Sequence, residues 1–254
     1  MRVSGRIERL SLAAIRMAAS GVSEDLATLA RWLYQFGTVP RSPAIDRDFG
    51  PDDDPMAVLG MTVGGRTRRR LEAVFDARSL SGWYSFARTG TPTQYAAACK
   101  LYVSPRPDAL AAAFPRIVDV FIRAELRSFK VGRGIEGLLR PDKIVAYFDD
   151  RAELESVARS LERTLRGCPP QGTPFTNDVG GNGLLSAGVD PPIGSEAHSW
   201  RAWVTRQLAA SVSTHRAIAS DDCLAAVLTD MRTAGVDPHN WKPSAGAFVA
   251  TSTS

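Results

Sequence analysis

The sequence predicts an α+β protein in which a small mixed or antiparallel sheet is flanked by helices and preceded by an N-terminal helical segment. Residues 5–19 and 23–36 carry the apolar spacing of amphipathic helices. Short strand patterns occur at "CKLYVSP", "SFKVG" and "KIVAYFDD". Helical patterns follow the first and the third of these strands. The resulting order, strand–helix–strand–strand–helix, is typical of α+β domains.

The N-terminal part should form two helices followed by a long connection. In the second helix, Ser23 is a candidate N-cap. The segment "TVPRSPAIDRDFGPDDDP" predicts a loop because it is rich in proline and aspartate. The next stretch is ambiguous, since Gly64 and Gly65 either turn a hairpin or precede a short helix. The expected buried stripe of the second helix is Leu26, Leu29, Ala30, Leu33 and Phe36.

The C-terminal half alternates clear helices with one loop-rich segment. Pro115 either kinks or divides the helix that follows the first strand, and Gly167 closes the helix that follows the third. Residues 168–195 are rich in proline and glycine, and long loops of this kind often carry function. Two further helices follow. The predicted divisions are an N-terminal helical segment (1–40), a loop-rich connection (41–79), an α+β domain (80–245) and a flexible tail (246–254).

Composition indicates a globular protein with an unusual source of positive charge. The 254 residues carry a net charge of +4, and only four of the 31 basic residues are lysines. An arginine excess suits a phosphorylated or acidic partner, and it equally suits GC-rich coding. Three widely spaced cysteines predict neither a disulfide framework nor a zinc site. No apolar run reaches membrane-spanning length, and the N-terminus resembles an amphipathic helix more than a signal peptide. These features predict a cytoplasmic protein.

Several catalytic motifs are absent from the sequence. There is no GxxxxGK[ST], HExxH or GxSxG motif, and the three histidines are scattered. A nucleotide hydrolase, a zinc enzyme and a serine hydrolase are therefore not expected.

Lys130 is the principal candidate for catalysis because it lies on a strand with apolar neighbours. A lysine with its ordinary pKa of about 10.4 is protonated at neutral pH and cannot act as a base. Burial and nearby cations lower that pKa, and Arg133 and Arg140 are close in sequence. The same arginines could hold a phosphate group. The alternatives are that Lys130 faces solvent from an edge strand and that the arginines are solvated loop charges.

Other candidates each have a structural alternative. Tyr102 alternates with apolar residues on its strand, where a core tyrosine is the commoner case. Ser199 can cap the helix that begins near "HSWRAW", which makes Arg201 a candidate phosphate clamp. Thr173 and Thr176 lie in a turn, where they either contact a peptide or stabilise the turn itself.

Five segments resemble, in this order, the HopA1-type effector proteins. They are "KLYVSPRPDAL", "FKV", "RPDKIVAYF", "GTPFT" and "GVDPP…SWR". The likeness covers about residues 80–215, with a weaker similarity at "WLYQFGTVP". Relatives of this family act in the biosynthesis of lanthipeptides of the fifth class and of thioamitides. There they work beside an aminoglycoside-phosphotransferase-like kinase, as lyases on phosphorylated Ser or Thr. "KLYVS" and "FKVGR" are also similar to two strands of the phosphothreonine lyases of the OspF and SpvC type.

This resemblance implies an enzyme that eliminates phosphate from phosphorylated Ser or Thr of a ribosomal precursor peptide, giving dehydroalanine or dehydrobutyrine. Lys130 takes the place of the base, and Tyr102 stands where those lyases have a histidine that acts as acid. No metal or nucleotide is expected, because phosphate leaves readily once its charge is offset. The implied partners are the precursor peptide and the kinase, with no nucleic acid and no membrane. The expected phosphate ligands are Arg133, Arg140 and Arg201, and the expected peptide contacts are Thr173, Thr176 and His198.

Two other functions stay open. A non-catalytic module could bind a phosphopeptide or leader peptide, or scaffold the kinase, and residues 168–195 would suit that role. An effector-like protein with a host target is the third possibility.

Overall fold

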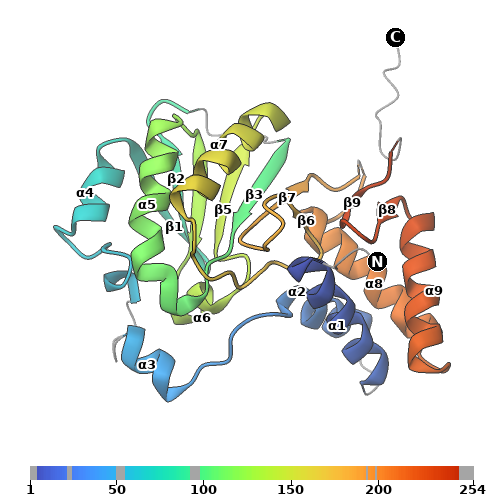
Figure 1. Ribbon diagram of the computed structural model, residues 1–254. Coiled ribbons are helices and arrows are strands. Elements are labelled where there is room, and N and C mark those ends of the chain that lie inside the picture. Colours follow the sequence, from blue (N-terminus) through green and yellow to red (C-terminus); the bar gives the residue numbers. More distant parts are fainter. Residues whose placement is uncertain are drawn as a thin grey trace, which may run out of the picture. The chain divides into compact units, whose positions relative to one another are not determined.

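The computed structural model confirms the α+β fold class (Figure 1). It describes residues 5–21, 25–49, 55–91, 98–192, 194–197 and 199–245. The chain divides into two compact units. The helical unit comprises the described residues of 1–36, 174–178 and 188–254, and the sheet unit comprises those of 37–173 and 179–187. The tail predicted at 246–254 lies outside the described residues, and the boundaries predicted at residues 40, 79 and 245 stay predictions.

The sheet has seven strands in the order β1-β2-β4-β5-β3-β7-β6. Adjacent strands among the first five pair in the antiparallel sense. The three strands predicted from the sequence are therefore central, and β4 lies between β2 and β5. The strands are β1 (Phe75–Leu80), β2 (Trp83–Arg88), β3 (Cys99–Val103), β4 (Ser128–Gly132), β5 (Ile144–Phe148), β6 (Asn177–Asp178) and β7 (Leu185–Val189).

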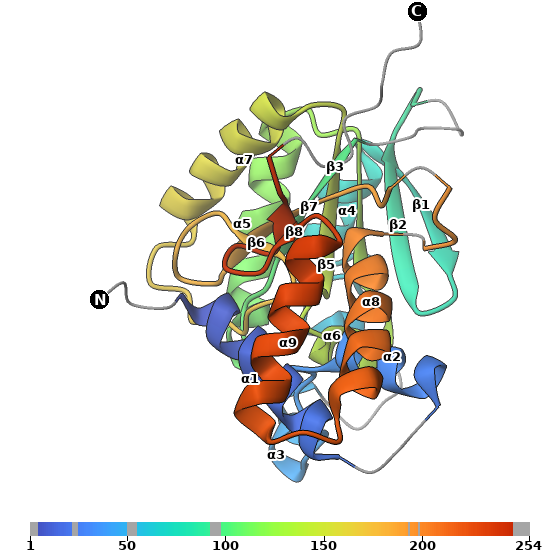
Figure 2. The ribbon, with the colours of Figure 1, turned by 90° about the vertical axis from the view of Figure 1, so that its right-hand side faces the viewer.

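One face of the central strands is apolar and packs against helices. Figures 1 and 2 both show α5 (Leu110–Arg123) and α7 (Arg151–Thr164) on the same side of the sheet. Phe129 of β4 is the centre of an aromatic cluster, with its ring centroid 4.7 Å from that of Phe86, 5.1 Å from Phe121 and 5.3 Å from Phe75. Residues two apart on a strand share a face, so Val131 belongs to this core and Lys130 does not.

The remaining helices of the sheet unit are short. They are α3 (Pro43–Phe49), the 3₁₀ turns η1 (Pro55–Ala57) and η2 (Pro107–Ala109), α4 (Arg66–Glu72) and α6 (Gly134–Leu139). A Cβ atom at Gly132 would lie 2.2 Å from the Gly137 carbonyl oxygen, so the chain can turn from β4 directly into α6 only with glycine there. This tight turn brings Arg140, at the end of α6, back beside the sheet.

The helical unit consists of α1 (Arg6–Ser20), α2 (Leu26–Gln35), α8 (Trp200–His215) and α9 (Ser220–Thr233), with the two-residue strands β8 (Val236–Asp237) and β9 (Lys242–Pro243). Figure 2 shows α8 beside α9, and apolar side chains from all four helices form one core. Ser199 caps α8 as predicted, since its Oγ accepts a hydrogen bond from the Ala202 N–H at 3.2 Å. Among the described residues, no helix combines the length and apolar character that a membrane crossing requires.

Several local expectations were wrong. The N-cap of α2 is Asp25, whose Oδ1 accepts from the N–H groups of Ala27 and Thr28, while Ser23 lies outside the described residues. Leu26 is 52% exposed and so is not part of the buried stripe. Pro115 lies inside α5 and does not divide it, and the alternative of a kink stays a prediction. The loop predicted at 38–55 contains α3, whereas the described part of 168–195 is rich in loops as predicted and contains the short strands β6 and β7. Of the two alternatives for Gly64 and Gly65, the second is confirmed, because the pair precedes a short helix, α4.

Candidate functional site

Lys130 and Tyr102 lie in one row across the centre of the sheet. Lys130 is opposite Val145, and Val145 is opposite Tyr102 on its other side. Directly opposed residues of antiparallel strands project from the same face. Two strand spacings of about 4.8 Å place the Cα atoms of Lys130 and Tyr102 roughly 10 Å apart. The structure therefore brings together the two residues that sequence analysis assigned to catalysis.

The same row defines a polar face opposite the apolar core, which we call the lysine face. By the strand register it carries Trp83, Lys100, Tyr102, Lys130 and Tyr147. Lys100 is opposite Tyr147, and Trp83 is opposite Gly132, two residues beyond Lys130. A lysine, a tyrosine and a tryptophan on neighbouring strands are unusual for a face that only packs, and they place proton-transfer groups against aromatic rings.

Lys130 is half-buried on an interior strand, which rules out the edge-strand alternative. Its Nζ lies 4.1 Å from the centroid of the Trp83 ring and 5.9 Å from that of Tyr147. Burial lowers the pKa of Lys130 from 10.5 to about 8, with Arg140 and Lys100 acting in the same direction and Asp142 opposing them. A useful fraction of this lysine is consequently neutral near physiological pH.

Arg140 lies at the same place, held by a carboxylate. Its Nε and Nη2 each contact one oxygen of Asp142 at 2.8 Å, which is a bidentate ion pair. The guanidinium carbon lies 4.9 Å from the centroid of the Trp83 ring, so Trp83 contacts both cations. The Asp142 side chain is only 3% exposed, and that of Arg140 is 29% exposed. Arg140 is thus a partly accessible cation beside Lys130, the lysine whose pKa is lowered.

Arg133 lies against the opposite face of the sheet. Its Nη1 donates to Ser79 Oγ at 2.7 Å, and its guanidinium carbon lies 5.6 Å from the Tyr84 ring centroid. Ser79 and Tyr84 oppose each other, and Tyr84 packs against the apolar core. The geometry therefore does not support a phosphate site shared by Arg133 and Lys130.

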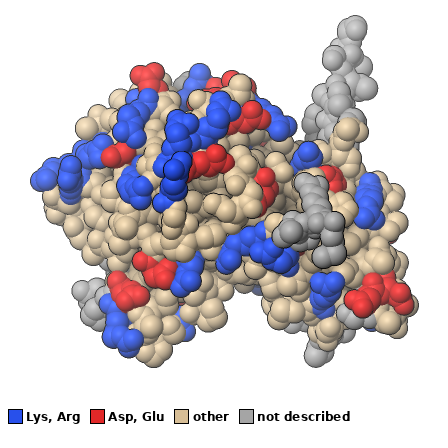
Figure 3. Space-filling view, in the orientation of Figure 1, with Lys and Arg blue, Asp and Glu red and all other residues tan. Residues whose placement is uncertain are grey.

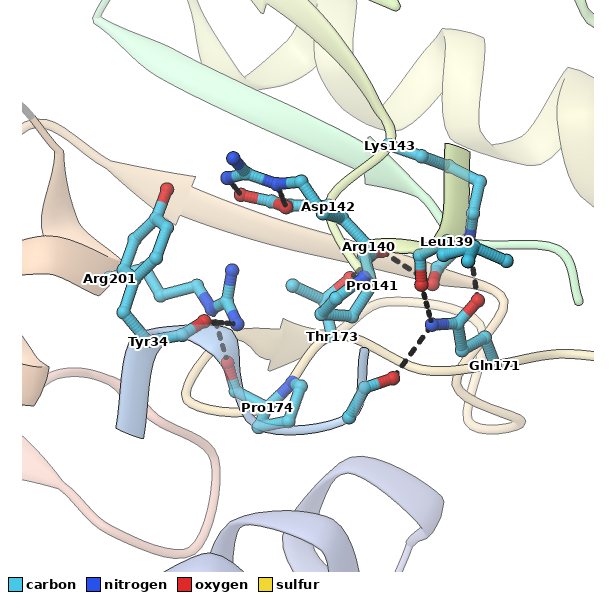
Figure 4. A network of polar contacts seen from close by, with 12 residues as sticks. Tyr34, Leu139, Arg140, Pro141, Asp142, Lys143, Gln171, Thr173, Pro174 and Arg201 are labelled. Atoms are coloured by element: carbon cyan, nitrogen blue, oxygen red, sulfur yellow. Dashed lines mark hydrogen bonds and ion pairs between the residues drawn. The ribbon is translucent and has the colours of Figure 1, made fainter. Parts of the chain in front are cut away.

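Arg201 is fully buried within the helical unit. Its Nε donates to the Pro174 carbonyl at 3.1 Å and its Nη2 donates to the Tyr34 carbonyl, as Figure 4 shows. The guanidinium carbon also lies 4.4 Å from the Tyr34 ring centroid. These contacts join the start of α8 to the end of α2 and to the backbone at Pro174. The phosphate-binding role of Arg201 stays a prediction.

Two of the three predicted peptide contacts are not surface groups. Thr173 and Thr176 are both fully buried. Thr173 Oγ1 donates to the Pro141 carbonyl at 2.9 Å, so this hydrogen bond is a structural contact with a distant segment of the chain and not with its own turn. His198 lies outside the described residues, so its role stays a prediction.

Sequence analysis missed four residues around Lys130. Lys100 was detectable, because it lies two residues before Tyr102 on the same strand and so shares its face. Asp142 is next to a proline in a loop, and Trp83 and Tyr147 gave no signal distinct from packing. Within the described residues, no group of three or more His, Cys, Asp and Glu side chains could hold a metal ion.

Part of the arginine excess lies on α4, α5 and α7 of the sheet unit. Figure 3 shows basic side chains over α4 and over α5 and α7, interspersed with acidic ones. Two of the α4 arginines are paired, Arg68 with Glu72 and Arg70 with Asp119. These pairs are solvated surface contacts on α4, which is not part of the lysine face.

No family model matches the chain, and no curated protein matches it in sequence. Two solved structures of Pseudomonas syringae effector proteins are similar along nearly the whole chain. One, from pathovar tomato strain DC3000, has a TM-score of 0.53 at 12% identity, and the other, from pathovar syringae strain 61, has 0.51 at 13%. In both cases the match covers 94% of this chain and 99% of the effector. The phosphothreonine lyase OspF from Shigella flexneri matches 48% of this chain and 74% of its own, with a TM-score of 0.39 at 12% identity. The two matches to the Pseudomonas syringae effector proteins show that the chain has their fold, which confirms the predicted resemblance to effectors of that type at the level of fold.

Proposed function

We propose that the protein is a lyase that eliminates phosphate from phosphorylated Ser or Thr residues of a peptide. The observation that supports this most is Lys130, a lysine of depressed pKa on an interior strand, beside the partly accessible guanidinium of Arg140. The reaction needs a base for the α-proton and a cation for the phosphate, and this face supplies both.

The depressed pKa changes what Lys130 can do at pH 7. With a pKa of about 8, about one molecule in ten carries a neutral lysine at that pH. With the ordinary pKa of 10.5, the neutral fraction would be roughly one in three thousand. The environment of Lys130 thus raises the population of active base by roughly 300-fold, which is comparable with the gain from general base catalysis.

The elimination can be written with these groups. The neutral Nζ of Lys130 removes the α-proton, and the electrons of the Cα–H bond form the Cα=Cβ double bond. The Cβ–O bond breaks, and its electron pair leaves with the phosphate. Arg140 offsets the growing charge on the phosphate oxygens. The proton passes from Lys130 to the departing phosphate, which leaves as hydrogen phosphate, and the lysine is neutral again.

Tyr102 and Lys100 have supporting roles in this proposal. Tyr102 shares the row of Lys130, so we assign to it the donation of a proton to the phosphate or the orientation of the phosphate; its exposure of only 3% also fits the alternative of a core tyrosine. Lys100 lies on the same face and lowers the pKa of Lys130 through its charge. An obligatory acid is not required, because Lys130 can return the proton that it removes.

The finer part of the proposal concerns the substrate. We infer a kinase-phosphorylated ribosomal precursor peptide of the lanthipeptide or thioamitide type, and this inference is supported by the sequence motifs at residues 100–110, 129–131, 140–148, 172–176 and 188–201. The fold similarity to effector proteins favours the rival function, a protein-binding or effector-like role.

One experiment separates these functions. The purified protein is incubated with a library of phosphoserine and phosphothreonine peptides with randomised flanking residues, and with the unphosphorylated library. A lyase releases inorganic phosphate and leaves dehydroamino acids that mass spectrometry detects, and Lys130→Ala does neither. Selective retention of phosphopeptides without phosphate release would identify a binding module. No preference for either library would contradict the phosphate site.

A further inference from the structure

We propose that Lys143 is a positioning residue for Arg140 and acts through the side-chain amide of Gln171. The consequence for phosphate recognition depends on the proposed function, whereas the positioning itself does not. Lys143 precedes β5, one residue after Asp142, and had no role assigned by sequence analysis.

Lys143 is a fully buried lysine with protein acceptors. Its Nζ donates to the Pro105 carbonyl at 2.9 Å and to Oε1 of Gln171 (Figure 4). Burial lowers its pKa from 10.5 to about 7, while the Asp142 carboxylate opposes this shift. A buried lysine is costly in any protonation state in comparison with an apolar residue of the same size. Its presence indicates that the hydrogen bonds it makes are needed.

The lysine and two backbone carbonyls together determine which way the Gln171 amide points. In its ammonium form Lys143 can only donate to Oε1, which favours the orientation with the amide NH₂ on the other side. There Nε2 donates to the Leu139 carbonyl at 2.9 Å and to the Gly37 carbonyl at 2.7 Å, and Figure 4 shows both bonds. The side chain of Gln171 thereby connects Lys143 with the peptide group between Leu139 and Arg140.

The chain is held on both sides of Arg140. Before it, Gln171 fixes the Leu139 carbonyl. After it, the Pro141 carbonyl accepts from Ser104 Oγ at 2.6 Å and from Thr173 Oγ1 at 2.9 Å. The guanidinium itself is held by Asp142. If Lys143 is lost, Oε1 of Gln171 loses its donor, and the side chain that donates to the Leu139 carbonyl is held less firmly. Arg140 would then sample positions away from Trp83.

The test is a binding comparison with two variants and a control. Lys143→Met removes the donor that orients the amide. Gln171→Glu keeps the acceptor for Lys143 but removes both NH₂ bonds. Leu161→Ala, in the apolar core on α7, lowers stability without touching this network. Dissociation constants are measured for a phosphoserine peptide and its unphosphorylated counterpart, with folding checked by circular dichroism.

Both network variants should lower the preference for the phosphorylated peptide by roughly tenfold, the lower end for a weakened charge-assisted contact. Leu161→Ala should keep the preference of the parent. In an Arg140→Ala background, Lys143→Met should cause no further loss, because the two residues act through one contact. Additive losses, or an unchanged preference in both network variants, would overturn the proposal.

A second measurement keeps this inference separate from the proposed function. The side-chain Nε–H signal of Arg140 is followed by NMR and assigned by its absence in Arg140→Lys. The ion pair with Asp142 should give one sharp signal in the parent and a shifted or broadened one in Lys143→Met. If the unmodified protein shows no preference for the phosphopeptide, the proposed function is contradicted and the positioning role of Lys143 is not. An Arg140 signal identical in parent and Lys143→Met would end the positioning role, whatever the function.

Discussion

The pH dependence of elimination follows directly from the environment of Lys130. The base must be neutral, so the rate rises with pH through the pKa of Lys130, which is about 8, and then levels off. Between pH 7 and pH 9 the neutral fraction increases from about 9% to about 91%, a tenfold rise. A lysine with its ordinary pKa of 10.5 would give a hundredfold rise over the same interval, with no plateau. The substrate phosphate is mainly a dianion throughout, because its second pKa is about 6.

The assay is a set of single-turnover rates on one purified phosphopeptide between pH 6 and pH 10, roughly two units on either side of the midpoint. Rates measured with Lys130→Ala are subtracted, which removes elimination by hydroxide. Removing a cation that lowers the pKa should move the midpoint upward, so Arg140→Ala is expected to shift the profile to higher pH. Arg123→Ala, on the exposed side of α5, should leave the midpoint unchanged.

The outcome that would refute this reasoning is specific. A log rate that rises with unit slope past pH 9 would show that burial does not depress the pKa of Lys130 in solution. A profile that is flat from pH 6 to pH 9 in the parent would show that another group is the base.

Four further predictions follow from the same contacts. Lys130→Ala and Lys130→Arg should both abolish elimination and keep phosphopeptide binding, because a guanidinium cannot deprotonate; full activity in either variant would remove the assignment. Arg140→Ala should cost about 1.5–3 kcal/mol of the preference for phosphorylated peptide in paired binding titrations, and an unchanged preference would contradict the phosphate contact. Tyr102→Phe should reduce the single-turnover rate far less than Lys130→Ala, whereas comparably inactive variants would make Tyr102 an obligatory acid. For Lys143, the folded-state pKa lies below the unfolded one, so the unfolded chain binds more protons and stability should rise with pH above 7. Between pH 7 and pH 9.5 this contributes at most about 3 kcal/mol, so urea unfolding of Lys143→Met should lack that part of the rise; equal rises in parent and variant would contradict the depressed pKa.

The parts of the fold that were predicted from the sequence are strands and helices with a clear apolar pattern or a capping residue. The strand at 128–132 has alternating burial and neighbours typical of strands, and the helix at 151–164 has a capping aspartate, Asp150, at its start. The hairpin β1–β2 was missed because β1 is an exposed edge strand in which only Phe75 is buried. An edge strand of this kind has no apolar alternation for a pattern to detect.

The sequence could not predict which helices pack against one another when they are far apart along the chain. An amphipathic helix shows that it has a buried face but not what covers that face. The stripe of α2 carries Leu29 and Leu33, and its core partners in the helical unit include Val204 and Leu208, about 170 residues later. Only the folded chain reveals that the two ends share one core.

The site shows the same division between local and long-range information. The spacing of three residues places Arg133 and Lys130 on opposite faces, because side chains alternate between the two faces along an extended chain. The location of Arg140 could not be obtained in this way. It depends on the turn between Gly132 and Gly137, where the backbone approaches so closely that no side chain fits. Spacing in the sequence therefore grouped the two arginines, and the three-dimensional path of the chain separated them.

Two neighbouring residues on β4, Phe129 and Lys130, have different roles, and the role of Lys130 depends on that of Phe129. Phe129 lies among three other aromatic rings and anchors the strand to the apolar core. That anchoring holds Lys130 against Trp83 and away from water, which is the main cause of its lowered pKa. In the unfolded chain the same lysine would return to its ordinary pKa, and the arginine and tryptophan beside it would be distant. The reactivity that we propose is thus a property of the packed sheet: the apolar face supplies the stability that allows a lysine to be held, partly desolvated, on the other face.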